Sequence, residues 1–342
     1  MNLLCCAAAS VLAGVACAQP AALTPAARPL ITHDPYFSVW SMTDELTDNW
    51  PRHWSGTPMG MSGMVWVDGK AYRWCGPAPQ EAPAAERIGG GVTIDKTSYL
   101  FTAGGVNLAV EFWSPQSLTG VADDMVQASR SVSVVKFRAS CPDKRPHDVR
   151  VYLDLSGEWC TNNPDDKVAW SRHRVAACGD VLSLGRVEQP VLQHAGDQRR
   201  IDWGRVYLAG TGASDRGGAG GHNASRSRFV QTGGALESDD LRMPRAANDD
   251  WPVLAMVVDL KRIEPGDVAE GQVLIGYDEG EAIELFGRKL RPLWNADGKR
   301  GFAQELALAA EVCRRDDALL GQAHNQFWTE AARVGGDRYA KL

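Results

Sequence analysis

The sequence predicts a mainly β protein, an antiparallel β-sandwich followed by helices near the C-terminus. Short runs of alternating apolar and polar residues are separated by turn residues at the spacing typical of a sandwich. Helical segments that would connect parallel strands are missing between these runs, which argues against a doubly wound sheet. Apolar residues recur at helical spacing from about residue 281 onward, which predicts the C-terminal helices.

Composition and charge describe an ordinary globular chain. Of its 342 residues, 44% are hydrophobic and 23% are charged, and this length suffices for a buried core in about two domains. The net charge is -6, with 36 basic and 42 acidic residues, so neither nucleic acid nor an anionic membrane is favoured as a partner.

Residues 1–18 predict a cleaved signal peptide. The apolar stretch "LLCCAAASVLAGVACA" is too short to span a bilayer, and Ala16-Cys17-Ala18 fits a small-x-small cleavage site. Residues 19–29, rich in Ala and Pro, are interpreted as a linker. We therefore expect a periplasmic or extracellular protein without a transmembrane segment. A lipoprotein with modified Cys17 is the alternative.

Residues 30–280 are predicted to form the sandwich domain. The runs "TSYLFTA" and "VNLAVEFW" flank Gly104-Gly105, which indicates a hairpin whose tight turn needs positive φ. Further strands are predicted at "SVSVVKF", "HDVRVYLDL", "RVYLAG", "VLAMVVDL" and "EGQVLIGY". The Gly- and Ser-rich segment 211–228 is predicted to be a mobile loop.

Residues 281–322 are predicted to be connecting helices. The first is short, "EAIELFGRKLRPLW", and ends at Pro292; the second carries Phe302, Leu306 and Ala309 at helical spacing. Residues 323–342 are interpreted as the truncated start of a further helical domain, with a break at "VGG". Such short helices should leave apolar side chains exposed, among them Phe327, Trp328 and Tyr339.

The cysteines give little support to a metal or redox site. Five of eight remain after signal cleavage, and no C-x-x-C pair occurs. Because an oxidising compartment permits disulfides, Cys160 and Cys178 are the favoured pair by proximity in the sequence. The alternative is that all are small buried apolar residues.

Two stretches mix aromatic and charged residues. The first, "THDPYFSVWSMTDELTDNWPRHWSG", contains His33, Asp34, Arg52, His53 and Trp54. Adjacent residues on a strand point to opposite faces, so His33 and Asp34 are poor partners for each other.

The second stretch, 188–209, contains Asp197, Arg200, Asp202 and Trp203. Arg pairs bidentately with carboxylates, so Arg200 is expected to be clamped by Asp197 or Asp202 at a turn. The alternative is a cleft wall where Asp202 and Trp203 face a polar ligand.

Four motifs in consistent order carry a resemblance to a known family. The segments "PLITHDPYFSVWS", "LTDNWPRHWSG", "GDQRRIDWG" and "LIGYDEGEAIELFGRKLRPLW" together resemble the N-terminal region of the glutaminase A family of exported amidohydrolases. The resemblance runs from about Arg28 to Leu342. It implies a supersandwich-like β domain before a six-hairpin helical domain, of which this chain contains only the start.

The resemblance implies a place for the first stretch. Phe37 and Trp40 would lie in the sandwich core. Asp34, Arg52, His53 and Trp54 would lie at a rim facing the helical domain, because a large interdomain interface needs an apolar centre and a polar edge.

The function implied is that of the non-catalytic N-terminal part of a secreted glutaminase-like hydrolase, inactive alone. No G-x-S-x-G or H-E-x-x-H motif appears, so no catalytic residue is named and neither cofactor nor metal is expected. Glutamine or a sugar would bind only in the full-length protein. The alternative is a carbohydrate-binding or structural β-sandwich module.

Overall fold

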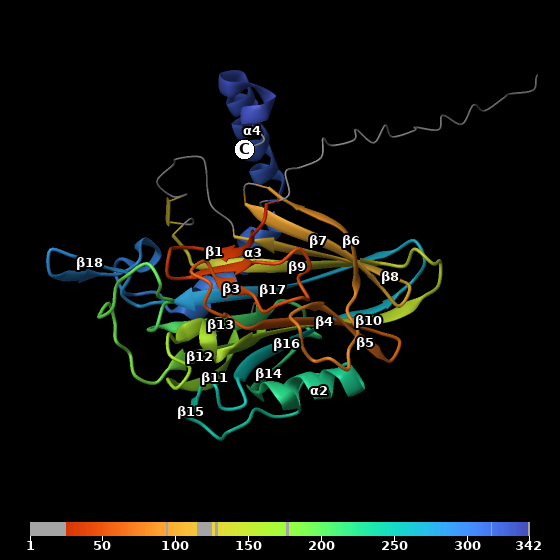
Figure 1. Cartoon of the computed structure of the whole chain (residues 1–342), viewed down its shortest axis with the longest axis horizontal. Coiled ribbons are helices and arrows are strands. Elements are labelled where there is room, and N and C mark those ends of the chain that lie inside the picture. Colours follow the sequence, from red (N-terminus) through yellow and green to blue (C-terminus); the bar gives the residue numbers. More distant parts are fainter. Residues whose placement is uncertain are drawn as a thin grey trace, which may run out of the picture.

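Two antiparallel sheets stack on each other in the computed structural model (Figure 1). The structure describes residues 25–93, 95–114, 125–126, 129–175, 178–315 and 317–340. Of residues 311–325 it describes only the backbone. Over these residues the smaller sheet has the strand order β14-β16-β10-β4-β5 and the larger sheet β15-β11-β12-β13-β17-β9-β8-β7-β6. The predicted sandwich followed by helices is confirmed. The predicted signal peptide and residues 19–24 of the linker lie outside the described residues.

The chain alternates repeatedly between the two sheets. The smaller sheet contains β4 (Met61–Val67), β5 (Lys70–Cys75), β10 (His147–Ser156), β14 (Arg216–Gly221) and β16 (Pro252–Ile263). The larger contains β6 (Glu86–Val92), β7 (Lys96–Ala103), β8 (Val106–Trp113), β9 (Val132–Ser140), β11 (Lys167–Val175), β12 (Gly179–Arg186), β13 (Arg205–Gly210), β15 (Arg245–Ala246) and β17 (Val268–Asp278). A third sheet at the start of the domain joins β1 (Arg28–Thr32), β2 (Ser38–Ser41) and β3 (Arg52–His53).

Each sheet also carries a helix on its outer face. The main core, with Trp74 and Phe137 at its centre, lies between the sheets. On the smaller sheet, α2 (His222–Thr232) buries Phe229 against Tyr152. On the larger sheet, α3 (Phe302–Arg315) buries Phe302 against Tyr207. Because β16 is covered on both sides, it reads as a continuous apolar run rather than as an alternating one.

The predicted hairpin around Gly104-Gly105 is confirmed. β7 and β8 pair in register from Lys96 with Trp113 to Ala103 with Val106, and both glycines have positive φ. The five other predicted runs lie within β9, β10, β13, β16 and β17, apart from Ser131, which directly precedes β9.

The prediction of a mobile loop at 211–228 is wrong. Its second half forms β14 and most of α2. The glycines there allow close packing. A Cβ on Gly217 would come 3.0 Å from Leu182, and one on Gly221 would come 1.8 Å from the Asp250 carboxylate. Glycine in a strand marks such a close approach as often as it marks flexibility.

The prediction of a short helix at 281–292 is also wrong. These residues form a hairpin of β18 (Ile283–Leu285) and β19 (Arg288–Leu290), which projects from one end of the molecule (Figure 1). The two turn residues, Phe286 and Gly287, have φ of 49° and 74°, as a tight two-residue hairpin turn requires. A short 3₁₀ turn, η2 (Leu293–Asn295), follows after Pro292.

Two helices complete the described chain. After α3, α4 (Asp317–Ala340) projects away from the sandwich (Figure 1). Gly336 breaks the helical geometry of α4, as "VGG" predicts. The predicted boundary between the connecting helices and the further helical domain, at residue 323, lies inside α4. No helix end marks it, and the boundary stays a prediction. None of the helices in the described ranges has the length and hydropathy of a membrane-spanning segment.

The expected Cys160–Cys178 disulfide is absent. Cys75, Cys141, Cys160 and Cys178 are all buried and none of them forms a disulfide, so the alternative is confirmed for these four. Cys160, in the 3₁₀ turn η1 (Gly157–Cys160), belongs to the core between the sheets. Cys178 belongs to the cluster beneath α3, on the other face of the larger sheet.

Candidate functional site

Several of the nine predicted site residues meet at one place, the corner between β1 and β2, which we define as residues 33–37. Two side chains from the β3 region, His53 through Nε2 and Trp54 through Nε1, donate to the Pro35 carbonyl oxygen at 2.7 and 2.6 Å. From a third segment, the Ile201 amide donates to the Tyr36 carbonyl at 2.9 Å. The fold therefore joins both polar-aromatic stretches of the sequence at this corner.

Asp34 shapes the corner itself. Its Oδ1 accepts from the amides of Tyr36 at 2.7 Å and Phe37 at 3.0 Å, which turns the chain from β1 into β2. The carboxyl is half-buried, and burial raises its pKa in spite of these two hydrogen bonds. Asp34 is thus held in place by the turn that it stabilises.

His33 packs against the core residue Phe37. Its ring stacks on Phe37 at a centroid distance of 5.6 Å, and Nε2 lies 3.0 Å from the Ser133 hydroxyl. Burial lowers the pKa of His33 to about 4, so the ring is neutral at neutral pH. His33 and Asp34 have separate partners, which confirms that they do not act on each other.

Glu279 is the residue that sequence reasoning missed. It follows β17 and lies half-buried close to Asp34 and Asp278. Burial, followed by repulsion from the Asp34 and Asp278 carboxylates, raises the pKa of Glu279 to about 8. At neutral pH this carboxyl therefore retains its proton and can donate a hydrogen bond or a proton beside an acidic neighbour. In the sequence, "GYDEGE" resembles an ordinary polar turn.

The residues around β3 divide into an exposed and a buried group. Trp54 is 44% exposed, and Arg52 is half-buried with hydrogen bonds to the Gly56 carbonyl and the Asn49 amide oxygen. Both fit the expected rim. His53 does not, since it is fully buried and burial lowers its pKa. Because Nε2 donates to a carbonyl, Nδ1 accepts the Ser55 hydroxyl at 2.7 Å.

The expected clamp on Arg200 is wrong. Arg200 is buried, and among the described residues no carboxylate oxygen lies within 4.0 Å of its guanidinium. Nη1 instead donates to the Pro58 carbonyl, and the backbone amide donates to Asn162 Oδ1 at 3.2 Å. Burial lowers the pKa of Arg200. The side chain links the segment that precedes β13 to the segment that follows β3.

The remaining predicted residues belong to a separate ion-pair group or to a turn. Buried Asp202 pairs with Arg186 at 3.3 Å and with His194 at 2.9 Å. Trp203 is buried, donates from Nε1 to the Glu281 carbonyl, and accepts the Tyr277 hydroxyl on its own carbonyl. It anchors the turn that carries Glu279. Asp197 is exposed and lies outside the corner.

The expectation that Phe37 and Trp40 lie in the sandwich core is met by Phe37 and only in part by Trp40. Phe37 is fully buried in the main core, packed against Trp159 and Tyr277. Trp40 is half-buried, and its Nε1 donates to the Ser38 hydroxyl.

Two buried core cysteines are not activated as nucleophiles. Burial raises the pKa of Cys160 to about 12 and that of Cys75 well above its usual value, which keeps both thiols protonated. In the described part of the chain, no group of three or more His, Cys, Asp or Glu side chains is arranged to hold a metal ion. At the corner, Glu279 lies close to Asp34, and Trp54 is hydrogen-bonded to Pro35.

Comparisons with known proteins show that this chain is similar to parts of longer proteins. The profile of a family described as "Domain of unknown function (DUF5127)" matches residues 95–314, and that of "Domain of unknown function (DUF4964)" matches residues 1–81. Glutaminase A of Aspergillus oryzae is 27% identical over 277 residues, which cover 77% of this chain and 38% of that protein. A probable glutaminase of Arthroderma benhamiae is 28% identical over 274 residues, covering 72% of this chain and 30% of that protein. The chain thus spans about a third of the length of these curated relatives.

Solved structures resemble the chain only distantly. A polysaccharide lyase has a TM-score of 0.35 at 8% identity and is covered over 32% of its length by 74% of this chain. A GalM/aldose epimerase homologue from C. elegans has a TM-score of 0.32 at 8% identity, with 99% of its length covered by 74% of this chain. Similarity at this level carries no argument about function.

Proposed function

The chain belongs to the DUF5127 family, and from that premise we propose that it is the β-sandwich portion of a glutaminase-type amidohydrolase. The observation that carries the proposal is the similarity to two glutaminase-named proteins over about three quarters of the chain. In this proposal the whole protein converts glutamine to glutamate and ammonia, and the sandwich alone is inactive. Hydrolysis needs an activated water or nucleophile, which the remainder of the longer protein supplies.

The β1–β2 corner is proposed as one wall of the substrate cleft. Asp34 offers an acceptor and protonated Glu279 offers a donor close to it. Exposed Trp54 contacts the same corner through Pro35. A glutamine has both an ammonium group, which a carboxylate binds, and an amide, which a carboxylic acid can protonate as ammonia leaves. The opposite wall would come from the helical domain.

The test uses the longer polypeptide and residues 19–342 side by side, with ammonia release from glutamine as the readout. The longer protein should be active and the shorter one at background. In the longer protein, Glu279→Gln should lower kcat/KM by roughly 10²-fold, as loss of a general acid does. Arg138→Ala, an exposed residue paired with Glu270, is the matched control and should leave the rate unchanged. Turnover by residues 19–342 alone would contradict the proposal.

The pH profile gives a second test of the same wall. Because the pKa of Glu279 is raised to about 8, its proton is present below that pH and lost above it. Activity should therefore fall as the pH rises through about 8, and Glu279→Gln should remove this fall. A basic limb that persists in the variant would assign the titration to another group.

Export belongs to the proposal as well. We propose cleavage after Ala18 on the way to the periplasm or the medium, because the apolar segment and Ala16-Cys17-Ala18 fit a signal peptide. N-terminal sequencing of the mature protein should begin at Gln19. An intact Met1 or a lipid on Cys17 would refute it.

A further inference from the structure

A second ligand site is indicated where α2 begins beside the turn into β16. Two consecutive residues of this turn, Asp250 and Trp251, have φ of 53° and 32°, and neither is glycine. A residue other than glycine is strained in this backbone conformation, whereas glycine adopts it without strain. Strain of this kind persists only where the surrounding structure over-determines the conformation, and it clusters at active sites and ligand clamps.

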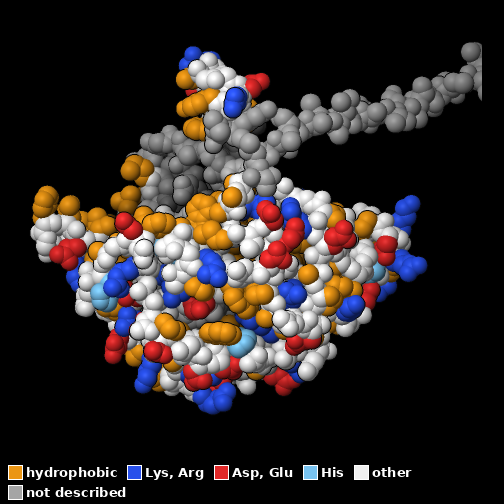
Figure 2. All heavy atoms as spheres, viewed as in Figure 1, with side chains coloured by type: hydrophobic (Ala, Val, Ile, Leu, Met, Phe, Trp, Pro, Cys, Tyr) orange, Lys and Arg blue, Asp and Glu red, His pale blue; other side chains and the backbone are white. Residues whose placement is uncertain are grey.

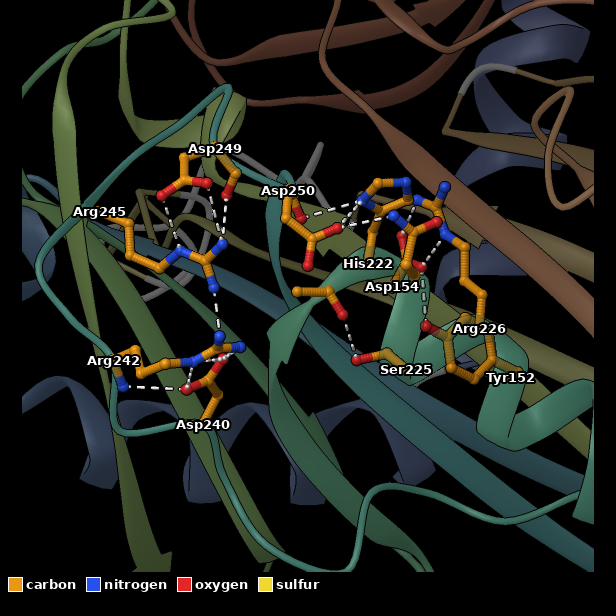
Figure 3. A network of polar contacts seen from close by, with 12 residues as sticks. Tyr152, Asp154, His222, Ser225, Arg226, Asp240, Arg242, Arg245, Asp249 and Asp250 are labelled. Atoms are coloured by element: carbon orange, nitrogen blue, oxygen red, sulfur yellow. Dashed lines mark hydrogen bonds and ion pairs between the residues drawn. The ribbon is translucent and has the colours of Figure 1, made fainter.

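The turn is held in place from both sides. Arg245 donates to the Asp249 carbonyl at 2.8 Å and to its carboxylate at 3.2 Å (Figure 3). From α2, the backbone amide and Nδ1 of His222 both donate to the Asp250 carbonyl, at 3.0 and 2.9 Å. The conformation is thus fixed before any ligand arrives, which lowers the entropy that binding must offset.

The Asp250 carboxylate is oriented by its neighbours. Asn223 Nδ2 donates to Oδ1 at 2.8 Å, and His222 Nδ1 lies 3.2 Å from the same oxygen (Figure 3). Gly221 makes room for the carboxylate, since a Cβ there would lie 1.8 Å from Oδ2. The imidazole contributes a further polar atom, because in the described part of the chain Nε2 of His222 has no hydrogen-bond partner.

Trp251 supplies an aromatic face next to these polar groups. It is 42% exposed, and its ring lies against His222 at a centroid distance of 5.1 Å. A large indole left open beside a carboxylate, an amide and an imidazole matches the two surfaces of a pyranose. The C–H face of such a sugar is apolar, and its hydroxyls lie at the ring edge.

We propose that Trp251, with Asp250, Asn223 and His222, forms a binding site for a neutral sugar, separate from the β1–β2 corner. The sugar stacks on Trp251 and donates hydroxyls to the Asp250 carboxylate and to His222 Nε2. Asn223 is exposed, and its side-chain amide accepts or donates a hydrogen bond to the sugar at the edge of the site. This site is independent of the proposed amidohydrolase activity and would hold the protein near glycan-rich material.

The experiment titrates residues 19–342 with maltotriose, cellotriose, xylotriose and chitotriose in turn, by calorimetry and by the indole N–H signals. At least one should bind with Kd on the order of millimolar, as a small open site allows. Trp251→Ala should weaken that binding about tenfold or more. Trp328→Ala removes a tryptophan of matching exposure, 40%, and should leave the Kd unchanged.

A second variant separates ligand binding from a structural role. Trp251→Gly relieves the positive φ, so the melting temperature should stay the same or rise while sugar binding is lost. If Trp251 only covers His222, the glycine variant should instead melt lower. Failure of all four sugars to bind, equal binding by Trp251→Ala, or a change in oligomeric state on Trp251→Ala would each overturn the proposal; the last would indicate a protein contact.

Discussion

A single buried ion pair connects α2 to the smaller sheet. Arg226 of α2 donates to both oxygens of Asp154 at 2.7 and 3.0 Å, and the Tyr152 hydroxyl donates to the same carboxylate (Figure 3). Both charged side chains are almost completely shielded from solvent. The pair itself is weak support for stability, but breaking it leaves a buried charge unpaired.

We therefore expect Arg226→Ala to lower the free energy of unfolding by about 3–5 kcal/mol. Arg138→Ala, which removes an exposed pair with Glu270, should cost about 0–1 kcal/mol. Chemical denaturation of both variants measures the difference. Equal, small effects would show that water reaches the Asp154 carboxylate.

A histidine between two aspartates makes stability depend on pH. Nδ1 of His147 lies 2.6 Å from Asp68, and Nε2 lies 3.0 Å from Asp143. Burial alone would lower the pKa of His147, but the hydrogen bonds and charges of these aspartates together raise it. Burial opposes ionisation of Asp68, but the Asp148 amide, followed by His147, holds the pKa of Asp68 below its ordinary value. The Arg145 amide, followed by His147, lowers the pKa of Asp143.

The sign of the effect follows from the raised pKa. The stabilisation is fully present below the unfolded pKa of about 6.5 and is lost as the pH rises through the higher folded pKa of His147. The melting temperature should thus fall between weakly acidic and weakly alkaline pH, and His147→Gln should flatten this fall. A wild-type profile that is flat from pH 6 to 8 would contradict the assignment.

Individual site residues were predictable only where their chemistry is local. Asp34 and Trp54 stand in a stretch whose composition is unusual for either a core strand or a loop, so the sequence points to them. Glu279 acquires its raised pKa from burial and from Asp34, which the fold brings close. Arg200 was misjudged because its sequence neighbours Asp197 and Asp202 point elsewhere, one to solvent and one to Arg186.

At the scale of elements, the hairpin β18–β19 shows how a short apolar pattern misleads. Ile283, Leu285 and Leu290 fit a helical stripe as well as an alternating strand, and the length of the segment does not decide between them. Phe286-Gly287 decides, because both residues adopt positive φ in the turn. The long runs of the sandwich were predictable since each alternates over a full strand, as β7 and β8 do.

Phe286 is 95% exposed, so it adds nothing to the fold of this chain. Asparagine accepts the left-handed conformation more readily than phenylalanine does, and Asn-Gly is the preferred pair in such a turn. We expect Phe286→Asn to leave the melting temperature unchanged or slightly higher. Phe229→Ala, in the buried interface beneath α2, should cost about 3–5 kcal/mol. Destabilisation by Phe286→Asn would mean that the tip packs against the body.

At the scale of the whole molecule, apolar side chains remain uncovered on two projections. The hairpin exposes Ile283, Leu285 and Phe286, and α4 exposes Phe327, Trp328 and Tyr339 as the sequence predicts. Figure 2 shows apolar side chains on both projections, in contrast to the mixed charged surface of the sandwich body. Isolated two-stranded hairpins and single helices are marginal in water without a covering partner. These projections are therefore suited to contact with other protein surfaces.

In isolation, residues 19–342 should cover these surfaces by self-association. Exposed aromatic residues on a projecting helix bury apolar area on contact, at about 25 cal/mol per Å². The double variant Phe327→Ser and Trp328→Ser should shift the protein toward monomer in sedimentation velocity, whereas Arg333→Ser on the same helix should not. Because neither aromatic side chain packs in the core, the melting temperature should stay unchanged. A wild-type chain that is monomeric at all accessible concentrations would show that the exposed aromatics do not drive association by themselves.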